Sequence, residues 1–486
     1  MEEDMNMKTR VVVLLKVLAA AAAVCMSPGM LPGEEFHVMP GGGTGAGTLA
    51  DPWSIEYAFS HPSEVQPGDT IWLHGGTYSG GYASYITGIA SMPITVRGYP
   101  AERPILDGNN DDARSLGTVL AVHGAHVVFR DFEVTSSDSV RPDNGHTNIP
   151  QGVTVYDSQN IKLINLVVHD VPGQGIAAWS ENTNAEVYGC IIYYNGVNGT
   201  FDHGMYVQNR YGTKRIADNI VCHQASHGIH CYGSSAAYLD NLVLEGNTVF
   251  EAGSLAGGSG RNILLGGMSI ARDPVVNANY TYFLGYNNNS NIGYSAGTVN
   301  AQVTNNYFIA GNVAIRLNVD PAAVVTGNFF SGELDPADMP VKYPSNTYVA
   351  SRPTSGQTVF VRPNQYEPGR ANITVYNWSG ASTVSVDISA VGLTVGRNYV
   401  VRDAQNFFGP PVATGIYNGT PILIPMTGLT TAVPIGTALF HPVHTGLQFG
   451  AFVIFDAGDG DKTAPSWTSP KPSFRAPCTM RVTVHK

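Results

Sequence analysis

The most constraining feature of this sequence is a short segment that recurs along much of the chain. From residue 117 onward, a small or asparagine residue repeatedly precedes a short run in which apolar and polar residues alternate. The copies are GTVLAV, QGVTVY, QGIAAW, HGMYVQ, HGIHCY, RNILLG, SNIGYS and VAIRLN, and from the second copy onward they lie 23 to 34 residues apart. Repeats of this length with short strands and Asn/Gly turns predict a solenoid. The competing interpretation, an antiparallel β-sandwich, would not place like residues in columns at this spacing.

A second motif runs in phase with the first. Strands that alternate with period two must stack on neighbouring strands in register to bury their apolar faces, so we expect the coils to stack in parallel. Asparagines at the bends between strands can then hydrogen-bond from coil to coil. The segments INLVV, DNIVC, GNTVF, NNYFI and GNFFS supply them as Asn165, Asn219, Asn247, Asn306 and Asn328.

The region before the repeats has the character of an N-terminal cap. GGGTGAGTLADPWSIEYAFS predicts a glycine-rich turn and a short amphipathic helix, and QPGDTIWLHGGTYSGG and SMPITVRGYPAERPILDG follow it. With the coil motifs, these stretches resemble the right-handed parallel β-helix superfamily of pectate-lyase-like, polysaccharide-acting secreted proteins, over about residues 36–350. The resemblance implies an all-β fold built as a right-handed parallel β-helix, and it is more specific for the fold than for one activity.

The texture of the sequence predicts four segments. Residues 1–27 have the basic start, apolar run and small residues of a signal peptide, so we expect a secreted protein, extracellular or periplasmic. Residues 36–355 form the parallel β-helix with its N-terminal cap. Residues 356–455 alternate apolar and polar side chains without coil spacing, which predicts a C-terminal antiparallel β-sandwich-like domain. Residues 456–486 are rich in proline, serine and charge and are expected to form a disordered tail.

Charge and cysteine content limit the kinds of partner that the protein is expected to bind. Only 13% of the residues are charged and the formal net charge is −11, which argues against nucleic acid as a partner. The N-terminal apolar run is short for a membrane span, so we expect no membrane contact after its cleavage. The cysteines beyond it show no CxxC pair and no metal-ligand spacing. We expect a monomer whose partner is a polysaccharide.

Alternation along the strands places one set of side chains outward, in columns one coil apart. One column contains His203, His227 and Arg261, and the next contains Tyr206 and His230. Because aromatic rings flanked by polar groups suit sugar rings, we predict a carbohydrate cleft with these five residues as its catalytic groups. The substrate-binding residues are expected to be Tyr156, Trp179, Asp202, Gln208, Arg210, Tyr232 and His146.

Two reactions fit such a cleft. In β-elimination on a uronic-acid glycan, our first expectation, one of the three histidines removes the proton α to the carboxylate. Tyr206 would protonate the leaving oxygen and Arg261 would neutralise the carboxylate. Hydrolysis, the second expectation, needs two carboxylates, namely Asp202 and one of Asp157, Asp170 and Glu181.

Two further classes of function share parts of this reasoning. A C5-epimerase would use the same proton abstraction as a lyase. A non-catalytic glycan-binding solenoid would scatter its aromatic and histidine side chains over several faces, whereas here they cluster.

Metal ions are not expected at this cleft. Lyases of the resembling superfamily often use calcium, which leaves calcium as the one alternative, but no tight Asp/Glu cluster accompanies the histidines. A zinc site made by His203, His227 and His230 lacks a convincing carboxylate or cysteine to complete it. We therefore predict no cofactor.

Overall fold

The computed structural model describes residues 33–458, except for 142–149, 198, 235–236, 259, 286–287 and 438–439. The expected signal peptide, the expected tail beyond residue 458 and His146 lie outside the described residues. Within the described part, no helix combines the length and apolar character needed to cross a membrane.

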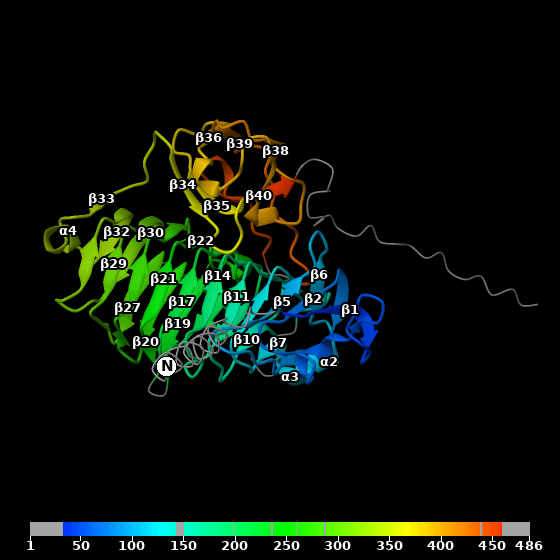
Figure 1. Ribbon diagram of the computed structural model, residues 1–486. Coiled ribbons are helices and arrows are strands. Elements are labelled where there is room, and N and C mark those ends of the chain that lie inside the picture. The colour runs from blue at the N-terminus through cyan, green and yellow to red at the C-terminus, as the bar shows by residue number, and fades with distance from the viewer. Residues whose placement is uncertain are drawn as a thin grey trace, which may run out of the picture.

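The body is a stack of coils, and the strands of successive coils pair in parallel from one end of the stack to the other (Figure 1). One side of the stack is an 11-stranded parallel sheet, in which each strand pairs only with its counterparts in the adjacent coils. Its strands are β1 (Glu35–Gly43), β2 (Thr70–Leu73), β5 (Ile94–Gly98), β8 (Val127–Arg130), β11 (Lys162–Ile164), β14 (Glu186–Tyr188), β17 (Lys214–Ala217), β21 (Leu242–Glu245), β25 (Val275–Asn277), β29 (Gln302–Thr304) and β31 (Val324–Thr326).

A second parallel sheet of 19 strands folds along an edge into two faces that share one long strand, β30 (Tyr307–Leu317). We call the first face the docking sheet. Besides β30 it contains β3 (Gly76–Ser79), β6 (Pro104–Asp107), β9 (Glu133–Thr135), β12 (Val167–His169), β15 (Ile191–Tyr193), β18 (Ile220–Cys222), β22 (Thr248–Phe250), β26 (Tyr280–Tyr282), β32 (Phe329–Asp335) and β33 (Thr347–Val349).

The second face, which we call the cleft sheet, carries the columns predicted to do chemistry. Its strands are β4 (Tyr82–Ser84), β7 (Thr118–Val122), β10 (Gln151–Val155), β13 (Ile176–Ala178), β16 (Met205–Val207), β19 (Ile229–Gly233), β23 (Ile263–Gly267) and β27 (Ser290–Ser295). A short parallel sheet of β20 (Leu239–Asp240), β24 (Ala271–Arg272) and β28 (Thr298–Val299) continues beside it. The all-parallel pairing excludes a sandwich for the body and confirms the predicted β-helix.

Among the described residues, helices are few and short. The predicted helix after the glycine-rich turn is α2 (Ile55–Phe59), which begins where the Ser54 hydroxyl accepts a hydrogen bond from the backbone N–H of Tyr57. The others are α3 (Asp111–Leu116), α4 (Met339–Lys342) and the 3₁₀ turns η1 (Ser254–Ala256), η2 (Ser389–Val391), η3 (Ala404–Asn406) and η4 (Gly446–Gln448).

Inward-pointing side chains of all three faces form one apolar core along the stack. At one corner, before the docking-sheet strands, six asparagines form a ladder in which each side-chain amide donates to the side-chain oxygen of the next coil, over 2.8 to 3.0 Å. The members of this asparagine ladder are Asn219, Asn247, Asn279, Asn306, Asn328 and Asn346.

The predicted stacking of asparagines is therefore confirmed, with one wrong member. Asn165 has a positive φ of 55° and lies one residue before the ladder position, which Cys190 occupies in the neighbouring coil. Its amide instead donates to Glu367 of the C-terminal region, over 2.9 Å. Asn279 and Asn346 are ladder members that the sequence pattern missed.

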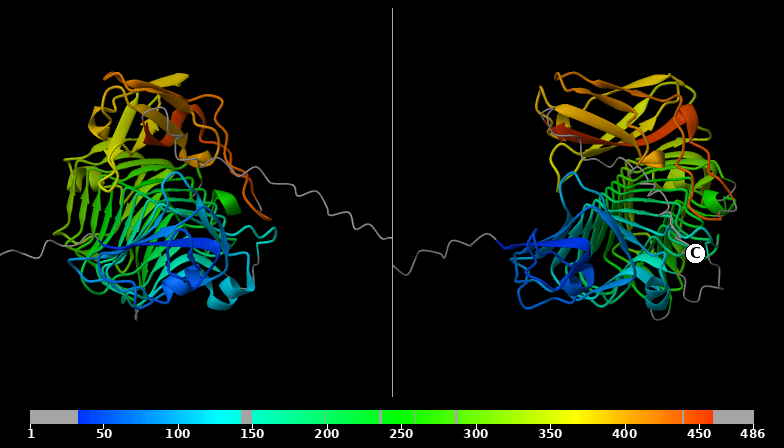
Figure 2. Two further views of the ribbon diagram at one scale, coloured as in Figure 1. Left: turned by 45° about the vertical axis from the view of Figure 1, so that its right-hand side comes forward. Right: turned by 90° about the vertical axis from the view of Figure 1, so that its right-hand side faces the viewer.

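The C-terminal region packs against the docking sheet (Figure 2). A five-stranded antiparallel sheet of β34 (Thr358–Pro363), β35 (Ala371–Tyr376), β40 (Phe449–Gly458), β37 (Asn398–Asp403) and β38 (Ala413–Ile416) faces a two-stranded one of β36 (Thr383–Val386) and β39 (Ile422–Pro425). Apolar side chains fill the space between these sheets, so the predicted sandwich-like arrangement is confirmed.

We predict that the asparagine ladder carries a large share of the coil-to-coil stability. Asn279→Ala would remove the acceptor of the backbone N–H of Asn247, one acceptor of its side-chain amide and a donor to the carbonyl of Leu244, all in a buried site, which should cost about 3 kcal/mol of unfolding free energy. Denaturant titration measures this cost. The surface substitution Asn109→Ala is the control and should change stability by less than about 0.5 kcal/mol. Equal effects of the two substitutions would contradict the prediction.

Candidate active site

A cleft of about 690 Å³ opens on the cleft sheet, over strands β10 to β27. The predicted columns are confirmed by the strand register, because Tyr206 pairs with Ala177 on one side and with His230 on the other, and His230 pairs with Leu264. Met205 and Val207 point into the core, as the alternation predicts. All five predicted catalytic residues line the cleft.

Close backbone approach explains why glycine follows each of the two leading histidines. A Cβ added to Gly204 would lie 2.8 Å from the backbone oxygen of Gly228, and one added to Gly228 would lie 2.7 Å from that of Asn262. Glycine lets adjacent coils approach here. The same approach stacks His203 and His227 face to face, with centroids 4.9 Å apart and planes within 3°.

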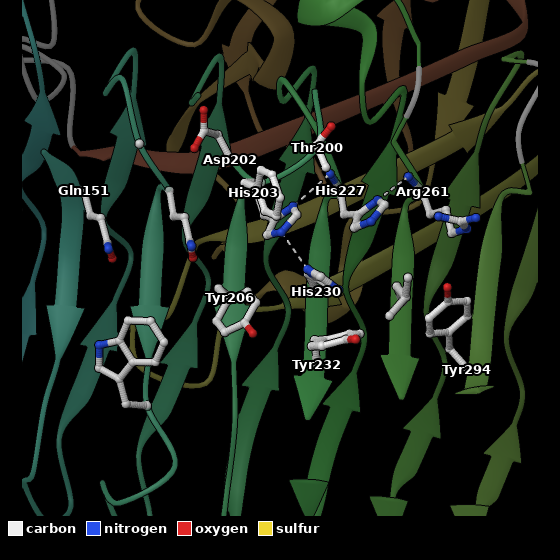
Figure 3. Close-up of a pocket in the computed structure, with 15 residues that line it drawn as sticks. Gln151, Thr200, Asp202, His203, Tyr206, His227, His230, Tyr232, Arg261 and Tyr294 are labelled. Carbon is white, nitrogen blue, oxygen red and sulfur yellow. Dashed lines mark hydrogen bonds between the residues drawn. The ribbon is translucent and has the colours of Figure 1, made fainter. Parts of the chain in front are cut away.

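Hydrogen bonds link the three histidines into a chain, partly through backbone amides and partly between the imidazoles of His203 and His230 (Figure 3). The N–H of Arg261 donates to Nδ1 of His227 over 2.9 Å, and the N–H of His227 donates to Nδ1 of His203 over 3.3 Å. Nε2 of His203 lies 2.6 Å from Nδ1 of His230.

These contacts fix the tautomer of each ring. A neutral imidazole has one N–H and one lone pair, and a nitrogen that accepts a backbone N–H uses its lone pair. His203 and His227 therefore carry their protons on Nε2. Since Nε2–H of His203 donates to Nδ1 of His230, His230 also carries its proton on Nε2. The outward nitrogens of His227 and His230 are hydrogen-bond donors.

Burial keeps the rings neutral. It is the largest cause that lowers the pKa of His203 and of His230 well below the usual histidine value, and neighbouring imidazoles lower both further. Burial, followed by the charge of Arg261, lowers the pKa of His227 to about 3. The cluster thus presents uncharged N–H groups beside one guanidinium at neutral pH.

The histidine cluster has the spacing of a metal site but not its hydrogen bonding. Its ligand atoms all lie within 4.8 Å of one another. A metal-bound imidazole, however, normally donates its second N–H to an oxygen acceptor, whereas Nδ1 of His203 and of His227 faces a backbone N–H donor. The residues present therefore do not fit zinc. Calcium takes six to eight oxygen ligands, and Asp202 is the single carboxylate among the described residues that line the cleft.

Tyr206 faces the histidine chain, with its ring 5.3 Å from that of His230 and nearly perpendicular to it. Its hydroxyl oxygen accepts a hydrogen bond from the side-chain amide of Gln208 over 3.3 Å, which leaves the phenolic proton to be donated into the cleft. Burial is the largest cause that raises the pKa of Tyr206, and the Gln208 bond lowers it in part.

The predicted substrate-binding residues divide into two groups. Trp179, Asp202 and Tyr232 line the cleft, although the Asp202 carboxylate points away from the imidazoles and accepts the N–H of Val197 over 3.0 Å (Figure 3). Gln208 is buried beneath Tyr206 and does not line the cleft.

Two other predicted residues lie outside the cleft. Tyr156 belongs to an aromatic column that continues past the cleft toward the N-terminal coils. Its ring stacks on that of His123, with the ring centroids 4.8 Å apart. Arg210 forms an ion pair with Glu181 over 3.4 Å, and its guanidinium lies over the ring of Tyr238. Its charge is therefore balanced by partners at the end of the strand. His146 is among the residues that the structure does not describe.

Other lining residues escaped sequence reasoning. Tyr294 points its hydroxyl toward the Arg261 guanidinium (Figure 3), and a bulge between Leu265 and Gly266 brings it into line with the aromatic column. Strict alternation of residues along the strand does not include this bulge, so the sequence pattern could not place Tyr294 in the column. Gln174, which shares the column of His203, has a buried side-chain oxygen without a partner among the described residues, as expected of a group that receives a ligand hydroxyl.

Coils of parallel strands around one core, with a cleft across one face, define the class of right-handed parallel β-helix proteins. Residues 36–318 match the family model described as Pel9A-like, right handed beta helix region, and the chain belongs to that family. No curated protein sequence matches the chain significantly.

Solved structures of the same fold include three carbohydrate-related proteins. Pectate lyase Pel9A is 18% identical over 62% of this chain and 80% of that chain, with a TM-score of 0.42. The alginate lyase from Paenibacillus sp. str. FPU-7 is 17% identical over 59% and 99%, with a TM-score of 0.38. The GH136 lacto-N-biosidase from Eubacterium ramulus is 14% identical over 62% and 67%, with a TM-score of 0.36.

The tautomers are directly measurable. In protein labelled with ¹⁵N-histidine, we expect NMR spectra in which His203, His227 and His230 are neutral with the proton on Nε2, unchanged from about pH 8 to about pH 5. Addition of Zn²⁺ should leave these three signals in place. A proton on Nδ1 of His227, or a shift on titration with Zn²⁺, would contradict the assignment.

Proposed function

We propose that this protein is a secreted carbohydrate-active enzyme that cleaves a uronic-acid polysaccharide by β-elimination in the cleft. One observation carries the proposal. The N–H groups of His227 and His230 and the guanidinium of Arg261 converge on the same cleft as the phenol of Tyr206. Donors that gather without a facing carboxylate suit a ligand that brings its own negative charge.

The donors serve the substrate carboxylate. Removal of the proton α to a carboxylate places extra negative charge on its oxygens, and preformed donors in a site shielded from water stabilise that charge. Arg261 supplies the cation, since its guanidinium lies beside the two imidazoles and its charge acts on both. The imidazoles contribute as donors rather than as proton acceptors, because their lone pairs on Nδ1 are already occupied.

Tyr206 carries the proton transfers. As a phenolate it takes the proton α to the carboxylate, the carbon–carbon double bond forms, and the bond to the leaving sugar oxygen breaks. The phenol then returns the same proton to that oxygen, so one group acts as base and as acid. The Gln208 amide, which donates to the phenol oxygen, stabilises the phenolate. The rings of Trp179 and Tyr232 on either side offer apolar surface to the sugar units.

Hydrolysis is less well supported. It requires two carboxylates across the scissile bond. The described lining residues contain Asp202 alone, and its carboxylate points away from the histidines. Of the three partners considered for it, Asp170 is buried in an ion pair with Arg141.

The reaction and its two principal residues can be tested together. On a panel of polygalacturonate, alginate, glucuronan and neutral glycans, we expect one uronate polymer to yield ultraviolet absorbance of an unsaturated uronate in step with new reducing ends. Tyr206→Phe should lower kcat by about 10²- to 10⁴-fold. Arg261→Met should lower kcat/KM by about 10²- to 10³-fold.

Tyr294→Phe is the matched control, because it removes a second phenol of the same cleft and should change the rate only a few fold. New reducing ends without absorbance would contradict elimination, and Asp202→Asn would then identify a hydrolase.

The pH profile distinguishes the phenol from the imidazoles as the base. Because burial raises the pKa of Tyr206 above the ordinary value of 10.0, its phenolate fraction and hence kcat/KM should keep rising through pH 10. A profile that is already flat from about pH 6.5 upward would indicate an imidazole base instead, because the pKa values of all three histidines lie below the usual 6.5.

A further inference from the structure

The boundary between the docking sheet and the C-terminal domain contains a buried chain of charges. Nδ1 of His169 lies 2.7 Å from Asp170, and its Nε2 lies 2.9 Å from Glu133. Arg103 pairs with the other oxygen of Glu133 over 2.5 Å, and Arg141 pairs with Asp170. The side chains of His169, Asp170, Glu133 and Arg141 are each at least 94% buried.

The C-terminal domain is bonded to both ends of this chain. The backbone N–H of Ile435 donates to Asp170 over 2.8 Å, and its carbonyl accepts a bond from Nε of Arg141 over 2.8 Å. Nearby, the hydroxyl of Tyr194 donates to the carbonyl of Ala432 over 2.8 Å. The ring of Phe408 covers Arg103 at 3.7 Å.

The same arginine is bonded to a turn that packs against Asp202 in the wall of the cleft. Nη1 of Arg141 donates to the carbonyl of Tyr194 over 2.6 Å and to that of Gly196 over 3.1 Å. The next amide, of Val197, donates to the carboxylate of Asp202 over 3.0 Å. Gly196 also packs tightly on Asp202, since a Cβ added to it would lie 2.5 Å from the Cβ of Asp202. Asp202 directly precedes His203, the centre of the imidazole chain.

We propose that Arg141 is a positioning residue through which the C-terminal domain holds the cleft wall, so that Ile435, the turn at Gly196 and the Asp202–His203 segment move as one unit. The domain is then part of the cleft and not a separable accessory. This holds for whichever reaction the cleft performs.

The chemistry of arginine suits this role. Its planar fork satisfies one carboxylate and three carbonyls at once, which a lysine ammonium with three donors on a flexible stem cannot reproduce. Removing one partner of a buried ion pair leaves an uncompensated charge and is strongly destabilising. We therefore expect the contacts of Arg141 to form or break together, without a stable state in which only some of them are made.

The clamp also responds to pH. Burial by itself would lower the pKa of His169, but hydrogen bonds and charges from Asp170 and Glu133 raise it to about 9. Because this pKa lies above the unfolded value of 6.5, the stabilisation from His169 is complete below about pH 6.5 and is lost as the pH rises through about 9. The groups that face His169 are Glu133, Asp170, Arg103, Arg141, Tyr193 and Tyr194, and the pKa values of both tyrosines are raised above 10.

Hydrogen–deuterium exchange of the full-length protein tests the coupling without any substrate. Arg141→Lys should speed exchange at Ile435 and Val197 together, by about tenfold or more, because each amide loses an acceptor that Arg141 holds in place. The amide of Asn306 in the distant ladder should not change. Faster exchange at Ile435 alone, or at neither amide, would overturn the proposal.

Arg370→Lys is the matched control. Arg370 is equally buried at the same boundary, but its partners are Glu367 and the carbonyl of Gly189, which do not lead to the cleft. Its substitution should leave Val197 protected. Asp170→Asn is the second variant, since asparagine tolerates the φ of 56° at this position.

In a second experiment, pH takes the place of a substitution at Arg141. After correction for intrinsic rates, protection of Ile435 and Val197 should fall together as the pH passes about 9, and His169→Gln should abolish this pH dependence. Independent loss at the two amides, or an unchanged pH dependence in His169→Gln, would overturn the coupling.

Discussion

Backbone hydrogen bonding between successive coils is the constraint on which the rest of this structure depends. Parallel pairing places each residue of a coil directly above one residue of the next, as for Ala177, Tyr206 and His230. The asparagine ladder fixes this register at one corner, since a slip by a single residue would break every rung. The cleft follows from the register, because side chains far apart in sequence are brought one coil apart.

The same constraint explains what could be predicted from sequence. The spacing of the HG segments was sufficient to align His203 with His227 and Tyr206 with His230, because a parallel coil leaves one register once apolar residues point inward. It failed at Asn165, which occupies the bend residue one position before the ladder position and whose side chain reaches the C-terminal domain. It failed again at Tyr294, behind a bulge that alternation does not encode.

Other properties of the site had no sequence signal. The pattern treated the histidines as exposed, whereas less than one tenth of each is exposed, because their rings pack on one another and on Tyr206. Their tautomers depend on two backbone amides whose directions are known only after folding. The sequence indicated Arg141 only as part of a loop beside the cleft, and His169 looked like an ordinary residue of a strand. Ile435, which bonds to Arg141 and Asp170, lies 265 residues beyond Asp170, a separation that no local pattern can bridge.

The two clusters of histidine show how one residue type acquires opposite charge states in one protein. His169 lies between two carboxylates and is held as a cation, whereas His227 and His230 lie beside Arg261 and other imidazoles and are held neutral. A cation at the domain boundary pairs with fixed acids and completes a structure. Neutral donors beside a guanidinium instead leave positive charge without a carboxylate partner in the imidazole cluster. Although the chain has a net charge of −11, the cleft is thus locally suited to an anion, and a bound carboxylate would complete its electrostatics.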